Sequence, residues 1–134
     1  MKIAIFGAGQ LAMMMIEASS DLGHEFIVID PASQPPASKL AKHYMTGYND
    51  EEILKFVVSE CDIATIDFEN VDISALKYLE NHIKVSPPSD ALKICQDRLY
   101  EKRLFTELGI NVTEYHSVNN IKDIEDIVCL LYTS

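Results

Sequence analysis

The chain has 134 residues and a formal net charge of −10, with 48% hydrophobic and 24% charged residues. This length and composition suit one compact globular domain that builds its core without disulfides or metal ions. The excess of acidic residues disfavours binding to nucleic acids or anionic membrane surfaces. Because no apolar run has the length of a membrane span and no signal peptide is evident, we expect a cytoplasmic protein.

The first thirty residues predict a strand, a turn, a helix and a second strand. The segment 2–6 is an apolar run closed by glycines, and from Gln10 onward hydrophobic residues recur at helical spacing. A second apolar run at 26–29 ends at Asp30 and a proline. This order is typical of a β-α-β unit with a right-handed crossover. Three methionines at 13–15 fall within the helix, and we interpret them as core packing.

Helices and strands continue to alternate as far as residue 88. The proline-rich segment 31–38 predicts a surface loop, because prolines lack the amide donors of a strand or helix. We expect short strands at 44–46, 63–68 and 83–85, and helices at 50–59 and 74–80. Asn49 or Asp50 is expected to cap the first of these helices. Such alternation predicts an α/β fold with a Rossmann-like, doubly wound, mostly parallel sheet.

The remaining segments predict a helical C-terminal extension. We expect helices at 90–96, 98–108 and 120–128, and a strand at 111–118. Ser89 and Asp97 are the expected N-caps of the first two helices, and Gly109 is the expected stop of the second. The expected organisation is a Rossmann-like domain at 1–88, a helical linker at 89–126 and an atypical tail at 127–134.

A glycine turn after the first strand is the first candidate binding site, because parallel sheets bind ligands beyond the carboxyl ends of their strands. The run from Gly7 to Ala12 matches the pattern G-x-G-x-x-A. Asp30 follows about twenty residues later, where dinucleotide-binding proteins place a ribose-binding acid. The glycines and the helix N-terminus also suit a single phosphate, and a tight turn without a ligand has the same pattern.

Further candidates follow the strand at 63–68 and open the helix at 98–108. Glu69 and Asn70 stand at a strand end, where they would accept hydrogen bonds from a ligand hydroxyl or amine, or form a solvated turn. Arg98 would clamp a phosphate or form an exposed ion pair along its helix. The sequence predicts no catalytic residue and no set of metal ligands.

Four stretches carry a resemblance to a known family. They are IAIFGAGQLAMMM at 3–15, VIDPASQPPAS at 28–38, ATIDFENV at 64–71 and PPSDALKICQDRLYEKRLFTELGI at 87–110. Together, over residues 2–118, they resemble the N-terminal domain of 5-(carboxyamino)imidazole ribonucleotide synthases, which are ATP-grasp carboxylases of purine biosynthesis.

The resemblance implies a ligase that uses Mg²⁺ and ATP to activate bicarbonate and that carboxylates 5-aminoimidazole ribonucleotide. It implies that the ribonucleotide is bound by Gly9, Gln10, Leu11, Glu69 and Asn70. It implies that Arg98 helps to hold ATP, that the metal ligands lie outside this chain, and that the enzyme is a homodimer.

Two positions and the tail depart from the family pattern. Met13 stands where many relatives carry a basic residue and Asp67 where Glu is more usual, and we assign neither a role. The tail at 127–134 does not resemble the family, so we expect a truncated or frame-shifted product that is catalytically incomplete. The alternatives are the same lobe of another ATP-grasp ligase such as a formate-dependent transformylase, a nicotinamide-dinucleotide-binding module, and an interaction domain without a ligand.

Overall fold

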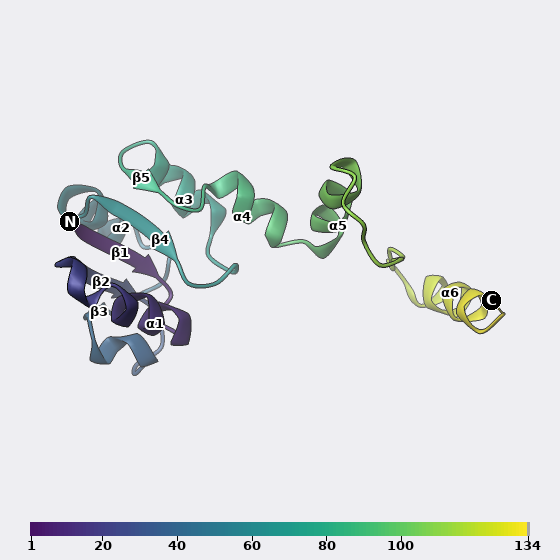
Figure 1. Cartoon of the computed structure of the whole chain (residues 1–134), viewed down its shortest axis with the longest axis horizontal. Helices are drawn as coiled ribbons and strands as arrows, with labels where there is room; N and C mark the ends of the chain where they lie inside the picture. The colour runs from purple at the N-terminus through teal and green to yellow at the C-terminus, as the bar shows by residue number, and fades with distance from the viewer. Residues whose placement is uncertain (134) are drawn as a thin grey trace. The chain divides into compact units, whose positions relative to one another are not determined.

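The computed structural model describes residues 1–133. The chain divides into two compact units, Met1–Gln96 and Asp97–Ser134. In the first unit, five parallel strands form one sheet in the order β3-β2-β1-β4-β5 (Figure 1). The strands are β1 (Lys2–Phe6), β2 (Glu25–Ile29), β3 (Lys42–Tyr44), β4 (Ile63–Ile66) and β5 (Lys84–Val85). The strand order reverses between β1 and β4, and this confirms the predicted α/β fold with a doubly wound parallel sheet.

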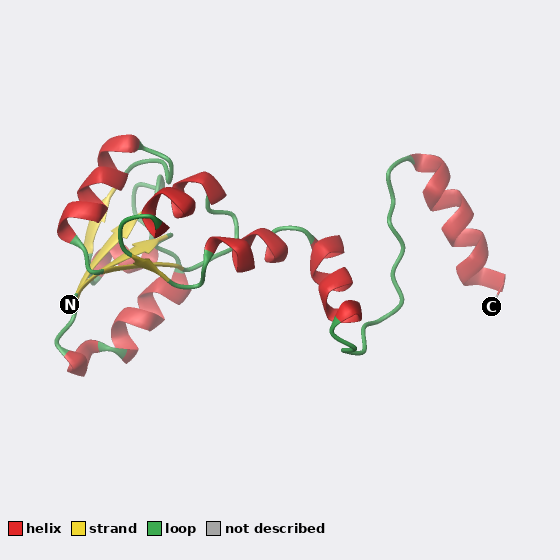
Figure 2. Ribbon diagram, turned by 90° about the horizontal axis from the view of Figure 1, so that it is seen from above, coloured by secondary structure: helices red, strands yellow, loops and turns green. Residues whose placement is uncertain are grey.

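Helices cover both faces of the sheet because alternate side chains of each strand point to opposite sides. Ala4 and Phe6 of β1 enter a core with α2 (Glu51–Glu60) and α3 (Ile73–Glu80). Ile5 enters a second core with α1 (Gln10–Ala18) and the 3₁₀ helix η2 (Pro36–Lys39). Figure 2 shows these helices on either side of the strands.

Aspartates begin three of the helices, and each accepts hydrogen bonds from backbone amides of the first turn. Asp50 caps α2, Asp72 caps α3, and Asp97 caps α5 (Arg98–Glu107). The expected cap at Asp50 or Asn49 is therefore Asp50. The expected cap at Ser89 is wrong, because Pro88 stands at that position and Ser89 is the first residue of α4 (Ser89–Cys95).

The segment at 31–38 is more buried than the surface loop that the sequence predicts. It runs into η2, where Ala37 is fully buried, and the amide of Ala37 donates to the Ala8 oxygen at 3.0 Å. The methionines also differ from expectation: Met13 packs against the core, but Met14 and Met15 are 54% and 36% exposed. The helical period turns residues 12 and 16 toward the sheet, which leaves 14 and 15 on the outer face.

The bounds of two strands differ from those expected. β3 begins and ends two residues earlier than expected, and β4 ends at Ile66 rather than at residue 68. The chain leaves α1 through a 3₁₀ turn, η1 (Ser20–Leu22), and Gly23 then adopts the left-handed conformation with φ +66°. Gly23 thus ends the helical segment.

The second unit contains α5 and α6 (Ile121–Thr133). α5 ends in a Schellman motif: Gly109 has φ +71°, and the amide of Ile110 donates to the Phe105 oxygen at 2.8 Å. The expected strand at 111–118 is wrong, because residues 97–133 contain no strand with which it could pair. α6 extends the expected helix at 120–128 through most of the tail, and Ser134 lies outside the described residues.

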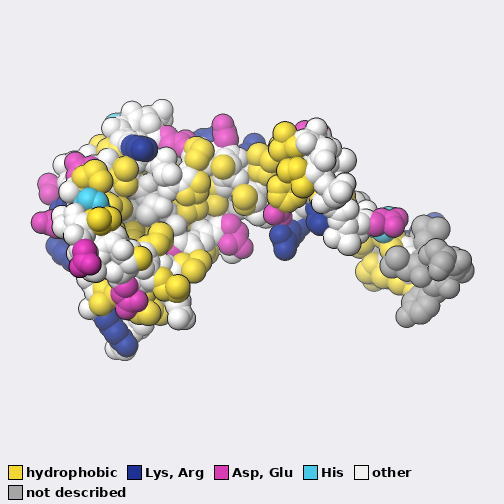
Figure 3. Space-filling view, viewed as in Figure 1, with side chains coloured by type: hydrophobic (Ala, Val, Ile, Leu, Met, Phe, Trp, Pro, Cys, Tyr) yellow, Lys and Arg dark blue, Asp and Glu magenta, His cyan; other side chains and the backbone are white. Residues whose placement is uncertain are grey.

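The surface bears mixed charges. On the face drawn in Figure 3, acidic and basic side chains are interspersed rather than gathered in one patch. Across residues 1–133, the structure has no helix that is both long and apolar enough to span a bilayer.

Candidate functional site

The carboxyl ends of β1, β2 and β4 bring three segments of the candidate site to one edge of the sheet. Phe6, the last residue of β1, pairs with Ile29 of β2 and with Ile66 of β4. The next residue of each strand therefore opens this edge: Gly7, Asp30 and Asp67. Helix α1 begins at the same edge, and three residues separate it from β1.

Gly7 and Gly9 form the turn between β1 and α1, next to the Asp67 carboxylate. Gly7 has φ +98°, a conformation that L-residues rarely adopt. A Cβ atom on Gly7 would lie 1.7 Å from Oδ1 of Asp67, and one on Gly9 would lie 2.9 Å from Oδ2 of Asp67. Gly7 is therefore required by its backbone conformation and by the Asp67 carboxylate, and a side chain at Gly9 would displace that carboxylate.

Two carboxylates accept hydrogen bonds from the backbone amides of this turn. The amide of Gly9 donates to Oδ2 of Asp67 at 2.7 Å, and the amide of Ala8 donates to Oδ2 of Asp30 at 3.0 Å. Asp30 also accepts hydrogen bonds from the amide of Ala32 at 2.8 Å and from the hydroxyl of Tyr48 at 3.2 Å. These carboxylates take up the donors that a dinucleotide-binding turn offers to a phosphate.

Burial and nearby negative charge raise the pKa of two groups at this edge, Asp67 and Tyr48. Burial raises the pKa of Asp67 and outweighs the hydrogen bonds from the amides of Gly9 and Ala12, and the charge of Asp30 raises it further. Burial also raises the pKa of Tyr48, to about 12, with Asp30 adding to the effect. Tyr48 therefore stays protonated at neutral pH and donates to Asp30.

The candidate ribonucleotide-binding residues lie on two segments at this edge. Gln10 and Leu11 open α1, and the Leu11 side chain is 60% exposed. Glu69 and Asn70 are exposed in the loop that follows β4. Their side chains are thus open to solvent at the edge where parallel sheets bind ligands.

Sequence reasoning missed two residues at this edge, Tyr48 and Gln96. Both line a groove of about 770 Å³ that also includes Asn70 and the N-terminus of α3. Gln96 ends α4 and donates from its side chain to two backbone oxygens of the loop after β4. No local pattern predicts these contacts, because they join residues far apart in the sequence.

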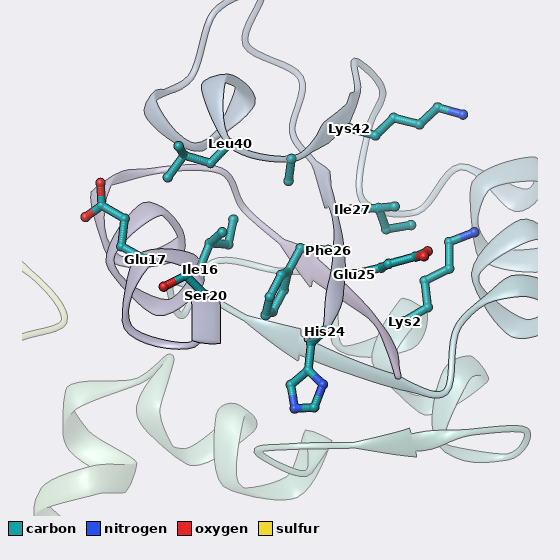
Figure 4. Close-up of a pocket in the computed structure, with 11 residues that line it drawn as sticks. Lys2, Ile16, Glu17, Ser20, His24, Glu25, Phe26, Ile27, Leu40 and Lys42 are labelled. Atoms are coloured by element: carbon teal, nitrogen blue, oxygen red, sulfur yellow. The ribbon is translucent and has the colours of Figure 1, made fainter. Parts of the chain in front are cut away.

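A second cavity, of about 710 Å³, lies at the opposite edge of the sheet and carries no coherent site. Figure 4 shows that Ile16 and Phe26 lie on one side of β2, whereas Ile27 and Lys42 lie on the other. This agrees with the core packing, in which Ile16 and Ile27 belong to different faces of the sheet. The lining side chains therefore do not converge on one ligand.

Arg98 opens α5 in the second unit. Its Nη1 lies 2.7 Å from Oε2 of Glu101, and its side chain is 87% exposed. Within the described residues there is no group of three or more His, Cys, Asp or Glu side chains that could hold a metal ion.

The chain matches a known protein family and several of its members. The family described as the ribonucleotide synthetase preATP-grasp domain matches residues 1–96. The N5-carboxyaminoimidazole ribonucleotide synthase of Pseudomonas aeruginosa is 34% identical over 125 residues, which are 93% of this chain and 35% of that protein.

Crystal structures of N5-carboxyaminoimidazole ribonucleotide synthetases are similar to this chain. The Staphylococcus aureus structure with ADP is 31% identical, with a TM-score of 0.86, and the match covers 95% of this chain and 34% of that one. The Thermus thermophilus structure is 33% identical, with a TM-score of 0.85, and the match covers 96% of this chain and 36% of that one. The chain spans about a third of the length of the relatives it matches.

Proposed function

The chain belongs to the ribonucleotide synthetase preATP-grasp family, and from that premise we propose that it is the N-terminal, ribonucleotide-binding part of an ATP-dependent ligase. The proposed ligase carboxylates 5-aminoimidazole ribonucleotide with bicarbonate in purine biosynthesis. The observation that carries this proposal is the match to the N5-carboxyaminoimidazole ribonucleotide synthase of Pseudomonas aeruginosa, which covers 93% of the chain at 34% identity. Other segments, equivalent to the rest of these relatives, would supply the remaining machinery.

In this proposal the ribonucleotide binds at the carboxyl edge of the sheet. Gly9, Gln10 and Leu11 would contact it from the start of α1, and Glu69 and Asn70 from the loop after β4. The exposure of Glu69 and Asn70 supports this assignment, because their oxygens are open to hydroxyl or amine donors.

ATP is the proposed cosubstrate, and Arg98 is its proposed contact in this chain. A guanidinium forms strong, charge-assisted hydrogen bonds with phosphate, whereas an exposed ion pair such as Arg98–Glu101 contributes little. Exchanging that pair for a phosphate contact is therefore favourable. Mg²⁺ would accompany ATP, but we assign it no ligand in this chain because the described residues hold no suitable cluster.

The alternative of a nicotinamide-dinucleotide-binding module fits the turn less well. A pyrophosphate would need the amides of Ala8 and Gly9, which donate to Asp30 and Asp67. Asp30 would need to reach a ribose hydroxyl, yet its oxygens accept hydrogen bonds from Ala8, Ala32 and Tyr48. Both observations weigh against a dinucleotide whose pyrophosphate lies on this turn.

A chimera tests the proposed function. Residues 1–118 would replace the equivalent segment of the Staphylococcus aureus synthase, and phosphate release from ATP would be measured with and without 5-aminoimidazole ribonucleotide. We expect release that depends on the ribonucleotide, and none from the 134-residue chain alone, because phosphoryl transfer depends on positioning by the other lobes. A folded chimera that binds ADP but shows no such dependence would contradict the proposal.

A further inference from the structure

We propose that Asp67 determines which class of ligand the Gly7–Gly9 turn accepts, because its carboxylate fills the turn's anion-binding position from within the chain and excludes phosphoryl groups. It rests on the geometry of the turn, and under the proposed function it implies that the phosphate of the ribonucleotide lies away from the amides of Ala8 and Gly9. It assigns a role to a residue for which the sequence pattern suggested none.

The Asp67 carboxylate fills the space beside the two glycines of the turn. In dinucleotide-binding turns, glycines allow a pyrophosphate to approach the backbone closely. Here the position of a Gly7 Cβ would lie 1.7 Å from Oδ1 of Asp67, and that of a Gly9 Cβ 2.9 Å from Oδ2. The space left by the missing side chains is therefore filled by the two oxygens of Asp67.

The Asp67 carboxylate also accepts a hydrogen bond from a backbone amide at the start of α1. The first amides of a helix have no partner within the helix and attract anions. At the start of α1, the amide of Gly9 donates to Asp67 at 2.7 Å, and the amide of Ala12 lies close enough to lower the pKa of this carboxyl. Asp67 thus takes the amide of Gly9, a donor that would otherwise be open to a phosphate.

The negative charge at the turn also opposes the binding of an anion. Asp30 holds the neighbouring amide of Ala8, so two carboxylates face the turn and a third anion would be repelled by both. Burial and the charge of Asp30 raise the pKa of Asp67, as expected for two acids at one turn.

Inorganic pyrophosphate is the probe for this inference, and the backbone amide resonances of Gly9 and Ala12 are the readout on the full 134-residue chain. In the wild type we expect no saturable shift of these resonances at millimolar pyrophosphate. In Asp67→Ala we expect saturable shifts confined to the turn and binding about tenfold tighter or more, because the competing carboxylate is gone. Asp67→Asn keeps an oxygen acceptor without the charge and should bind with intermediate affinity.

The matched control is Asp62→Ala. Asp62 stands at the start of β4, at the other edge of the sheet, where it accepts the amide of Lys2 at 2.7 Å. This variant removes the same charge and should bind pyrophosphate as the wild type does. An equal gain in Asp62→Ala would overturn the inference, since net charge alone would explain the binding.

Two other outcomes would also overturn it. One is a saturable shift at Gly9 in the wild type, and the other is a folded Asp67→Ala that binds pyrophosphate no more tightly than the wild type. If Asp67→Ala does not fold, Asp67→Asn decides the question by the same criterion. Failure of the proposed function would appear separately, as an absence of ribonucleotide binding by a wild type that still rejects pyrophosphate.

Discussion

The side-chain nitrogen of Gln96 lies 2.7 Å from the backbone oxygen of Glu69, a hydrogen bond between residues 27 positions apart. The same nitrogen donates to the backbone oxygen of Val71 at 2.8 Å. Because both partners are acceptors, the amide must present its nitrogen to them. Gln96 thus fixes the backbone on both sides of Asn70, so the proposed ribonucleotide-binding loop is held by its main chain while its side chains remain open.

Gln96→Glu should loosen this loop, because the substituted side chain presents a negative oxygen to two carbonyls. In the chimera we expect the KM for the ribonucleotide to rise about ten- to thirtyfold while the KM for ATP changes little, as two hydrogen bonds of about 1 kcal/mol each are lost. The effect should diminish in acid, where a protonated carboxyl donates again.

Asn81→Asp is the matched control for this variant. Asn81 also donates its side-chain amide to a backbone oxygen, that of Lys77 at 3.0 Å, but it does so at the end of α3 and not in the loop. Equal changes in the two variants would show that Gln96 has no special relation to the ribonucleotide.

Glu69→Gln in the chimera should impair use of the ribonucleotide without weakening the fold. The exposed side chain contributes nothing to the core, but a charged hydrogen bond to a ligand contributes about 1.5 to 3 kcal/mol. The ratio of kcat/KM for the ribonucleotide to that for ATP should therefore drop about tenfold or more. A lower melting temperature, or an equal loss for both substrates, would make Glu69 a structural residue of the loop.

Arg98→Ala should weaken ATP use in the same chimera. Loss of a guanidinium contact with phosphate removes about 1.5 to 3 kcal/mol, so kcat/KM for ATP should fall roughly ten- to a hundredfold. Arg103→Ala is the control, because it removes the same charge from an exposed position of α5. Unchanged ATP kinetics in Arg98→Ala would show that Arg98 does not hold ATP.

Glu80→Gln should lower stability in a pH-dependent way. Glu80 accepts the hydroxyl and the amide of Ser89 at 2.5 and 2.6 Å, and these hydrogen bonds lower its pKa. A lowered acid pKa stabilises the fold above the unfolded pKa of about 4.3, and this contribution is lost as the pH falls through the lowered folded value.

Urea unfolding of the 134-residue chain at neutral and at acid pH measures this effect. We expect Glu80→Gln to lose about 1 kcal/mol at neutral pH, since the Ser89 amide is buried, and progressively less below about pH 4. Glu17→Gln, on the exposed face of α1, should unfold like the wild type at each pH. A deficit for Glu80→Gln that does not depend on pH would contradict the role of its charge.

Local pattern predicted the order of the elements, because apolar runs, glycine turns and capping aspartates act over a few residues. It also predicted that the segments near Gly9 and Glu69 share one edge, since this follows from parallel strand order. It missed Gln96 and the role of Asp67, whose partners are 27 and 58 positions away. It misplaced Met14 and Met15, because a run of three methionines does not reveal which of them the helix turns toward the sheet.

The most direct test of the central claim is a titration of the isotope-labelled 134-residue chain with 5-aminoimidazole ribonucleotide, followed by its backbone amide resonances, with NAD as the comparison ligand. We expect saturable shifts for the ribonucleotide that map to Gln10, Leu11, Glu69 and Asn70, and no saturable shift with NAD. Saturable NAD binding at the Gly7–Gly9 turn, or ribonucleotide shifts confined to residues outside the carboxyl edge of the sheet, would contradict it.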